Sequence, residues 1–160
     1  MSRVLAIVPA RGGSKGVPGK NVRKLAGRTL LDYTALAARD SGVIDRIVLS
    51  TDSDDIADAG QRAGLEVPFM RPSSLAQDDT PMLAVIQHAL ETLAADGWTT
   101  DVVVLLQPTS PLRRPSHVRD AVTKLHETKA DSVVTVVELP TPAATATREN
   151  VVALVESSIE

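Results

Sequence analysis

Short apolar runs alternate with amphipathic stretches along this chain. Three mostly apolar runs, rich in aliphatic and β-branched residues, lie at 4–8, 46–51 and 101–107. Runs that lack regular polar alternation are typical of strands covered on both faces of a parallel sheet. Three further runs predict additional strands, at 65–70, 132–139 and 151–156.

Terminal signals mark two helices that follow the first two major strands. Thr29 precedes a segment of helical periodicity with Asp32 at its third position, which is the pattern of a capping box, and Gly42 ends that segment. Ser53 is the expected cap of a second, shorter helix, which Gly64 ends. Each of these predicted helices therefore lies between two predicted strands.

Two more helices complete the alternation. Thr80 and Pro81 supply the cap and the first-turn proline of a third helix, and a fourth spans 115–128. Strands joined by crossovers of ten or more residues require a mostly parallel sheet covered by helices, so we predict a three-layer, Rossmann-like α/β fold. Ligands of such sheets bind beyond the carboxyl ends of the strands, where the strand order reverses. Three predicted loops lie on that edge, at 9–28, 51–55 and 108–114.

Length and composition favour one domain. The chain has 160 residues, 43% of them hydrophobic, which is enough to form a core. The lack of cysteine excludes disulfide scaffolds, zinc-thiolate sites, iron-sulfur clusters and thiol nucleophiles. The first apolar run stops at Ala10 without a cleavage site, and no stretch reaches the roughly 18 apolar residues of a membrane span. We therefore expect a cytoplasmic protein without a membrane segment, with a flexible Ala/Thr-rich connection at 141–150.

Charge is distributed unevenly. The net charge is −3 and aromatic residues make up 2% of the chain, which argues against a nucleic-acid partner. One short segment nevertheless carries six cations and no acidic residue before Asp32: Arg11, Lys15, Lys20, Arg23, Lys24 and Arg28. Such a run is either a solvated basic loop or a site for an anion.

The same segment is rich in glycine, at positions 12, 13, 16 and 19. Glycines let backbone N–H groups approach a ligand closely, and with cations they can cradle several anionic oxygens. The spacing does not fit the dinucleotide pattern G-x-G-x-x-G, and Asn21 stands where a P-loop needs Ser or Thr. The segment is therefore a phosphate-binding loop of another design or a plain surface turn.

Four segments together resemble the acylneuraminate cytidylyltransferases. They are IVPARGGSKGVPGKN at 7–21, RIVLSTD at 46–52, MRPSSLAQDDTP at 70–81 and LLQPTSPLR at 105–113. The resemblance implies a fold of the nucleotide-diphospho-sugar transferase type. It also implies transfer of CMP from CTP to the anomeric hydroxyl of a nonulosonic, sialic-acid-like sugar, with release of pyrophosphate.

The resemblance also implies roles for single residues. Arg11, Lys15 and Lys20 match catalytic cations that hold the CTP triphosphate. Gln107 and Ser110 match residues between the nucleotide and the sugar, although Gln107 alone would be read as a strand-end residue that satisfies backbone groups. The other implied nucleotide contacts are Ala10, Gly12, Gly13, Ser14, Asn21, Arg71 and Thr80.

A metal ion is also part of what the resemblance implies. The family reaction implies Mg²⁺ or Mn²⁺, which prefers carboxylate and phosphate oxygens. Asp52 ends a predicted strand at the ligand edge, where it fits a helix cap at least as well as a metal ligand. The family's Asp-x-Asp metal motif does not follow residue 138, so we expect a chain truncated at its C-terminus, with most metal ligands outside it.

Alternatives stay open on the sequence alone. The chain could be a fragment that binds nucleotide with little turnover, could complete its site with a partner chain, or could be a nucleotide-binding module without activity. Another sugar-1-phosphate or isoprenoid-precursor nucleotidyltransferase is a further alternative, because those enzymes also carry a basic glycine-rich loop. An exposed edge on the predicted strand at 151–156 would favour self-association, so we expect a homodimer or higher oligomer.

Overall fold

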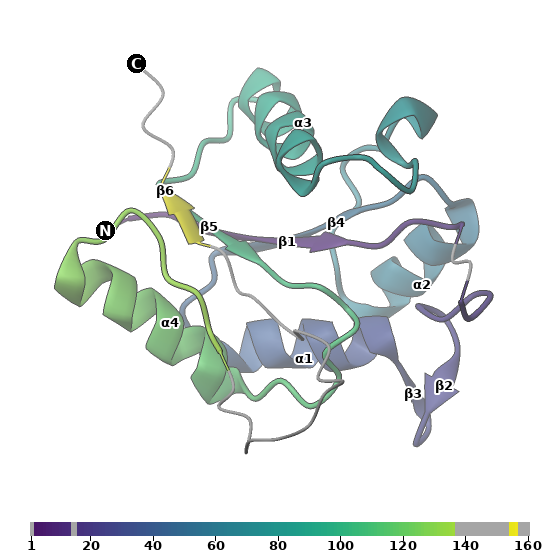
Figure 1. Cartoon of the computed structure of the whole chain (residues 1–160), viewed down its shortest axis with the longest axis horizontal. Helices are drawn as coiled ribbons and strands as arrows, with labels where there is room; N and C mark the ends of the chain where they lie inside the picture. The colour runs from purple at the N-terminus through teal and green to yellow at the C-terminus, as the bar shows by residue number, and fades with distance from the viewer. Residues whose placement is uncertain (1, 14–15, 137–153, 157–160) are drawn as a thin grey trace.

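A four-stranded sheet forms the centre of the computed structural model, which describes residues 2–13, 16–136 and 154–156 (Figure 1). The strand order is β4-β1-β5-β6. β1 (Val4–Pro9) pairs in parallel with both β4 (Arg46–Ser50) and β5 (Val102–Leu105). β6 (Leu154–Glu156) pairs antiparallel to β5. The prediction of a mostly parallel sheet is confirmed.

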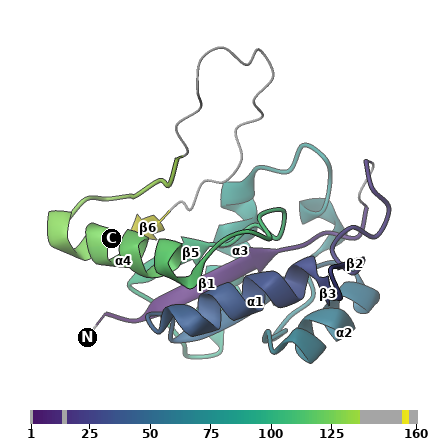
Figure 2. The same ribbon diagram turned by 90° about the horizontal axis from the view of Figure 1, so that it is seen from below.

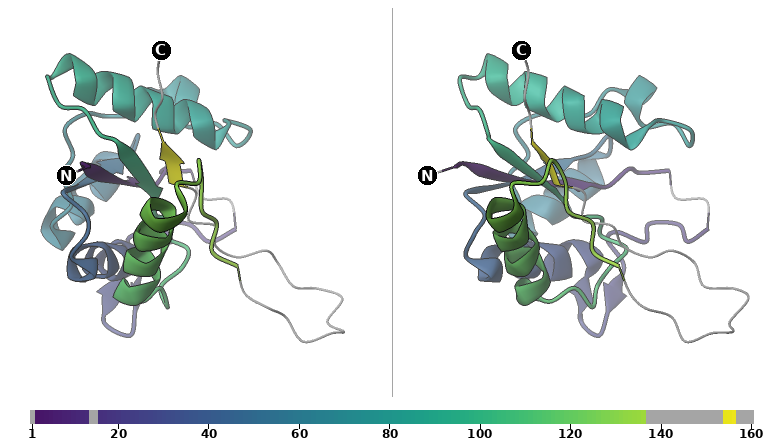
Figure 3. Two further views of the ribbon diagram at one scale, coloured as in Figure 1. Left: turned by 90° about the vertical axis from the view of Figure 1, so that its left-hand side faces the viewer. Right: turned by 60° about the vertical axis from the view of Figure 1, so that its left-hand side comes forward.

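Helices cover both faces of this sheet. α1 (Leu30–Ser41), α2 (Asp54–Ala63) and α4 (Pro115–Thr128) lie on one face, and α3 (Met82–Ala95) lies on the other (Figures 1 and 3). Figure 2, seen from below, shows α1 and α4 side by side in front of the strands. The three-layer α/β prediction is therefore confirmed.

The side chains of β1 alternate between two hydrophobic clusters. Val4, Ala6 and Val8 pack with α1, α2 and α4, whereas Leu5 and Ile7 pack with α3. All five side chains are almost completely buried. A fully buried Val, Leu or Ile side chain contributes about 1.5–3 kcal/mol of transfer free energy, which explains why the run at 4–8 has no polar alternation.

Local signals set the ends of the first helix. The Asp32 N–H donates to Thr29 Oγ1 at 3.1 Å and the Thr29 N–H donates to Asp32 Oδ2 at 2.7 Å, which confirms the capping box. Gly42 follows the helix with φ of 71°, in the left-handed region that favours glycine. The predicted helix is therefore confirmed at both ends.

Two helix starts differ from the sequence prediction. Ser53 precedes α2 as expected, but its side chain makes no capping hydrogen bond. α3 begins at Met82, with Pro81 as its N-cap, and the Thr80 hydroxyl accepts from the Gln77 N–H at 3.0 Å instead of capping the helix. Thr80 closes a turn in the preceding segment, so its prediction as a helix cap was wrong.

Two predicted strands do not form as expected. At 65–70 only one parallel bridge occurs, between Val48 and Glu66, because Pro68 cannot donate a ladder hydrogen bond. At 132–136 no strand forms, since β6 occupies the free edge of β5. Val136 is accordingly 83% exposed. Residues 137–139 and the predicted connection at 141–150 lie outside the described part of the chain.

A short hairpin was not predicted. β2 (Lys24–Leu25) and β3 (Arg28–Thr29) pair antiparallel around a two-residue turn, in which Ala26 has φ of 50° and Gly27 has φ of 86°. This turn places the exposed end of the basic segment away from the sheet (Figure 1). No helix among the described residues is long and apolar enough to cross a membrane.

The approach of α2 to β4 is testable at Gly60. Alanine is more favourable than glycine inside a helix by about 1 kcal/mol, so propensity alone predicts stabilisation by Gly60→Ala. A Cβ at Gly60 would overlap Cδ2 of Leu49, which is completely buried. We therefore expect Gly60→Ala to lower the free energy of unfolding by about 1–3 kcal/mol in denaturant titrations followed by circular dichroism.

Asp58→Ala is the matched control, because Asp58 is exposed on the same helix. Its effect should stay within about 0.5 kcal/mol. A gain in stability for Gly60→Ala would show that α2 does not pack this closely on β4.

Candidate functional site

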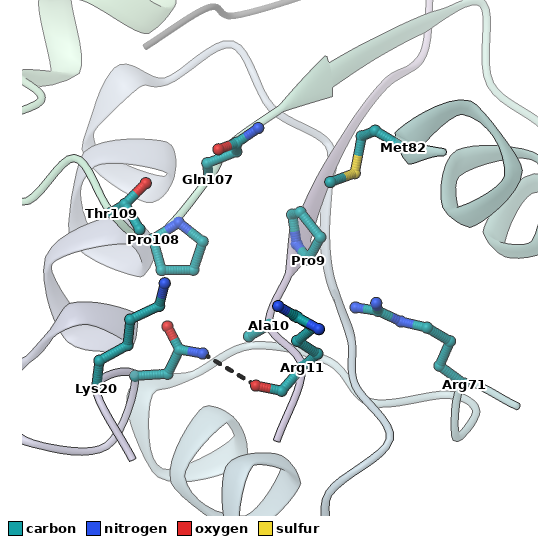
Figure 4. A pocket seen from close by; sticks show the side chains of 10 residues that line it. Pro9, Ala10, Arg11, Lys20, Arg71, Met82, Gln107, Pro108 and Thr109 are labelled. Carbon is teal, nitrogen blue, oxygen red and sulfur yellow. Dashed lines mark hydrogen bonds between the residues drawn. The ribbon is translucent and has the colours of Figure 1, made fainter. Parts of the chain in front are cut away.

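A pocket lies between the carboxyl ends of β1 and β5. These two strands flank the point where the strand order reverses, because the chain passes from β1 to β4 on one side and returns to β5 on the other. The pocket encloses about 180 Å³. It is lined by Pro9, Ala10, Arg11, Lys20, Asn21, Arg71, Met82, Gln107, Pro108 and Thr109 (Figure 4).

The backbone after β1 is fixed to the neighbouring strand. The Ala10 N–H donates to the Ser50 carbonyl at 3.0 Å, and the Gly12 N–H donates to Asp52 Oδ1 at 2.9 Å. A Cβ at Gly12 would lie only 3.1 Å from Cβ of Ser53. Glycine at position 12 therefore permits this close approach without a shift of Ser53. Asp52, which sequence reasoning left between metal ligand and helix cap, acts here as an anchor for the loop.

A tight turn ends the glycine-rich loop. Gly19 has φ of 64°, and its carbonyl accepts from the backbone N–H groups of Val22 and Arg23 at 3.0 and 3.1 Å. Asn21 is 3% exposed, and its Nδ2 donates to the Arg11 carbonyl at 3.4 Å, which is drawn as a dashed line in Figure 4. Asn21 thus ties the end of the loop to its beginning.

Only part of the basic segment reaches the pocket. Lys20 extends along the pocket wall toward Pro108, and no ion pair engages it within the described residues (Figure 4). Three other cations of the segment are exposed and line no part of the pocket: Arg23, Lys24 and Arg28. Ser14 and Lys15, both predicted site residues, lie outside the described part of the chain.

Arg71 enters the pocket from the segment that follows α2. Its Nε donates to Ser50 Oγ at 3.1 Å, its Nη2 donates to the Ser50 carbonyl, and its Nη1 donates to the Leu75 carbonyl at 3.4 Å. Burial lowers the pKa of Arg71, while Asp52 opposes this shift and the charge of Arg11 adds to it. The guanidinium has five N–H donors, so these contacts do not use its full capacity.

Arg11 lies between Lys20 and Arg71 in the pocket (Figure 4). Its Nη1 forms an ion pair with Asp78 Oδ1, from the segment that precedes α3. The three cations thus come from two regions of the chain that lie far apart in sequence. Their convergence produces a positively charged pocket that suits a ligand with several anionic oxygens.

The opposite wall is the loop 107–113. Arg113 Nη2 donates to the Gln107 carbonyl at 3.0 Å and the Arg113 N–H donates to the Ser110 carbonyl at 3.1 Å, so Arg113 closes this loop on itself. Burial lowers the pKa of Arg113 to about 10. Gln107 itself is exposed and lines the pocket, beside Thr109.

The pocket contains half of the predicted site residues. It brings together Ala10, Arg11, Lys20, Asn21, Arg71 and Gln107. Gly12, Gly13, Thr80 and Ser110 do not line it, and Ser110 is 7% exposed. Sequence reasoning missed Pro9, Met82, Pro108 and Thr109. Pro9, Pro108 and Thr109 belong to segments it had singled out, whereas Met82 carries only the spacing of a core residue.

Carboxylates near the pocket do not form a metal centre among the described residues. No group of three or more His, Cys, Asp or Glu side chains is placed to hold a metal ion in that part of the chain. Asp52 is engaged with the Gly12 N–H and Asp78 with Arg11. The residues described here therefore fit an anion better than a bare cation.

Comparison with known proteins shows which protein family this sequence matches. Residues 5–158 match the family model described as cytidylyltransferase. The chain is 43% identical over 134 residues to a CMP-N,N'-diacetyllegionaminic acid synthase of Legionella pneumophila, covering 84% of this chain and 57% of that protein. It is 33% identical over 138 residues to a pseudaminic acid cytidylyltransferase of Campylobacter jejuni, covering 86% of this chain and 60% of that protein. The chain thus spans less than two thirds of these curated relatives.

Solved structures show the same fold. CMP:2-keto-3-deoxy-manno-octonic acid synthetase, solved in complex with CTP, superposes with a TM-score of 0.70 at 17% identity, covering 97% of this chain and 74% of that one. A 4-diphosphocytidyl-2C-methyl-D-erythritol synthase superposes with a TM-score of 0.63 at 14% identity, covering 98% of this chain and 76% of that one. At these identities the likeness concerns the fold alone.

Asp52 provides a test of how the loop is held. Asp52→Asn keeps an oxygen that can accept from the Gly12 N–H, whereas Asp52→Ala removes it. With inorganic pyrophosphate as the probe in calorimetry, we expect Asp52→Asn to bind within about threefold of the unmodified chain. Asp52→Ala should bind about 5–20-fold more weakly, because a charge-assisted hydrogen bond that orders the loop is lost. Equal losses in both variants, seen only with Mg²⁺ present, would instead identify Asp52 as a metal ligand.

Proposed function

The chain belongs to the cytidylyltransferase family, and we propose that it transfers CMP from CTP to the anomeric hydroxyl of a nonulosonic acid. The convergence of Arg11, Lys20 and Arg71 between the carboxyl ends of β1 and β5 is the observation that carries this proposal. A nucleoside triphosphate supplies the several anionic oxygens that such a pocket suits. The names of the curated relatives support the choice of cytidine and of an acid sugar.

The proposed reaction needs no covalent intermediate with the protein. The anomeric oxygen attacks the α-phosphorus of CTP, the bond from that phosphorus to the bridging oxygen breaks, and pyrophosphate leaves with the electron pair. The hydroxyl proton passes to solvent or to a phosphate oxygen. The tasks of the protein are to align the two oxygens and to stabilise the charge on the phosphates.

Each cation of the pocket has a distinct proposed role. Lys20 acts as a mobile point charge on the phosphates, because its long side chain has no other partner among the described residues. Arg11 offers a planar pair of donors to adjacent phosphate oxygens. Arg71 is anchored on Ser50, so it provides a charge in a fixed place. Gln107 and Thr109 form the wall beside which the sugar would lie.

The sugar is proposed only as a class. The relatives at 33–43% identity are named for legionaminic and pseudaminic acids, and an N-acylneuraminate cytidylyltransferase of Escherichia coli is 35% identical over 144 residues, covering 89% of this chain and 33% of that protein. These acids are all nine-carbon 2-keto acids. We propose that this chain uses an acid of the same class.

The proposal includes Mg²⁺ or Mn²⁺, which would neutralise charge on the phosphates. Because the described residues hold no group of three metal-binding side chains, the ligands from this part of the protein do not make a site by themselves. We further propose that the protein acts in the cytoplasm. We also propose that it forms a homodimer or higher oligomer, and light scattering can measure this oligomeric state.

Lys20→Ala tests the role of the pocket. A hydrogen bond to a charged group is worth about 1.5–3 kcal/mol, so we expect CTP affinity in calorimetry to fall about 10–100-fold. Turnover with CTP, Mg²⁺ and a nonulosonic acid, followed by pyrophosphate release, should fall by a factor on the order of 10²–10³. The fold should stay intact, because Lys20 lies in the loop after β1 and belongs to neither hydrophobic cluster.

Lys24→Ala is the matched control, since Lys24 belongs to the same basic segment but is exposed on β2 and lines no part of the pocket. Its affinity for CTP should stay within about twofold of the unmodified chain, as expected for one distant, screened charge. Equal effects of both substitutions would contradict the proposed site. Absence of CTP binding by the unmodified, folded chain would contradict the proposed function.

A further inference from the structure

The segment 72–80, which contains the short 3₁₀ helix η1 (Ser73–Leu75), contacts both arginines of the pocket. Arg71 Nη1 donates to the Leu75 carbonyl at 3.4 Å, and Arg11 Nη1 forms the ion pair with Asp78. In the first contact the segment contributes a backbone carbonyl, and in the second it contributes the side-chain carboxylate of Asp78. Asp78 therefore contributes an ionic link between this segment and the loop that follows β1.

The segment also holds its own shape. The Gln77 N–H donates to Thr80 Oγ1 at 3.0 Å, and Gln77 Nε2 donates to the Ser73 carbonyl at 2.7 Å. The Thr80 N–H donates to the Gln77 carbonyl at 3.3 Å. Because these bonds are internal, a change at Asp78 can alter how the segment is attached without unfolding it.

The ion pair is accessible to a ligand. The side chains of Arg11 and Asp78 are 33% and 42% exposed. In an ion pair this exposed, water screens the charges, so the paired arrangement of Arg11 and Asp78 is favoured over the separated one by no more than about fivefold. A di- or triphosphate offers Arg11 several charged oxygens in place of one carboxylate, so it can displace Asp78 from the guanidinium.

We propose that Asp78 is a positioning residue that acts on the phosphates through Arg11. This proposal rests on the proposed function, in which the pocket takes the phosphates of a nucleotide. Without ligand, Asp78 holds Arg11 and attaches the segment 72–80 to the pocket. When phosphate oxygens bind, Arg11 exchanges the carboxylate for phosphate and this ionic link is released, while the contact of Arg71 with the Leu75 carbonyl remains. Nucleotide occupancy and the attachment of this segment are thereby coupled.

The test compares Asp78→Asn with Asp79→Asn. Both variants remove one negative charge from the same segment, but Asp79 has no ion pair within the described residues. The probes are inorganic pyrophosphate, which has phosphates only, and cytidine, which has none. In calorimetry at low ionic strength, we expect Asp78→Asn to bind pyrophosphate about 2–5-fold more tightly than Asp79→Asn. Cytidine should bind equally to both variants.

The substitution Arg11→Gln tests whether Asp78 acts through Arg11 or only through its own negative charge. In that background the difference between Asp78→Asn and Asp79→Asn should disappear, because no guanidinium remains at position 11 for Asp78 to hold. A difference that persists would show that Asp78 does not act through Arg11 and would overturn the proposal. Pyrophosphate affinity of Asp78→Asn equal to or weaker than that of Asp79→Asn would overturn it as well.

Failure of the proposed function has a different signature. If the unmodified chain bound neither CTP nor pyrophosphate, the pocket would not be a nucleotide site, and the coupling proposed here would be excluded with it. The ionic link could still be measured by hydrogen exchange in the ligand-free protein. Faster exchange at 75–80 in Asp78→Asn than in Asp79→Asn would support the attachment, and equal exchange would contradict it.

Discussion

Burial of β1 on both faces, together with parallel pairing along both of its edges, is the constraint on which the other parts of this structure depend. Leu5 and Ile7 face α3 while Val4, Ala6 and Val8 face the opposite helices, so a shift of one residue would exchange the two sets. The carboxyl end of β1 is therefore fixed between β4 and β5. The loop that begins at Pro9 starts from a defined point at the place where the strand order reverses.

From that point the site is assembled by polar contacts between segments distant in sequence. Ser50 accepts from the Ala10 N–H and from Arg71, so one strand end orients both the loop and an arginine. Asp52 holds the backbone of the loop, whereas Asp78 holds a side chain of it. Like charges gathered in one pocket repel one another, and these oxygens offset part of that repulsion. The carboxylates near the pocket thus stabilise a basic site.

Local signals explain which elements were predicted correctly. The capping box at Thr29 and the left-handed glycine at 42 act within one turn of helix, so the neighbouring residues decide them. The predictions at 65–70 and 132–139 relied on apolar content alone. Pairing decided 65–70 and the described residues 132–136 instead, because Pro68 interrupts one ladder and β6 occupies the edge needed by the other. An apolar run becomes a strand only where a neighbouring edge is free.

The sequence by itself determined the fold class, the family resemblance and the three loops at the ligand edge of the sheet, because apolar periodicity, caps and motifs are encoded over short distances. Tertiary structure decided which cations share one pocket. Lys20 lines the pocket while Lys24 is exposed, and spacing in an irregular loop does not fix that difference. The contacts of Gly12 with Asp52 and of Arg11 with Asp78 span 40 and 67 residues of sequence. Only packing of the whole sheet brings such partners within hydrogen-bonding distance.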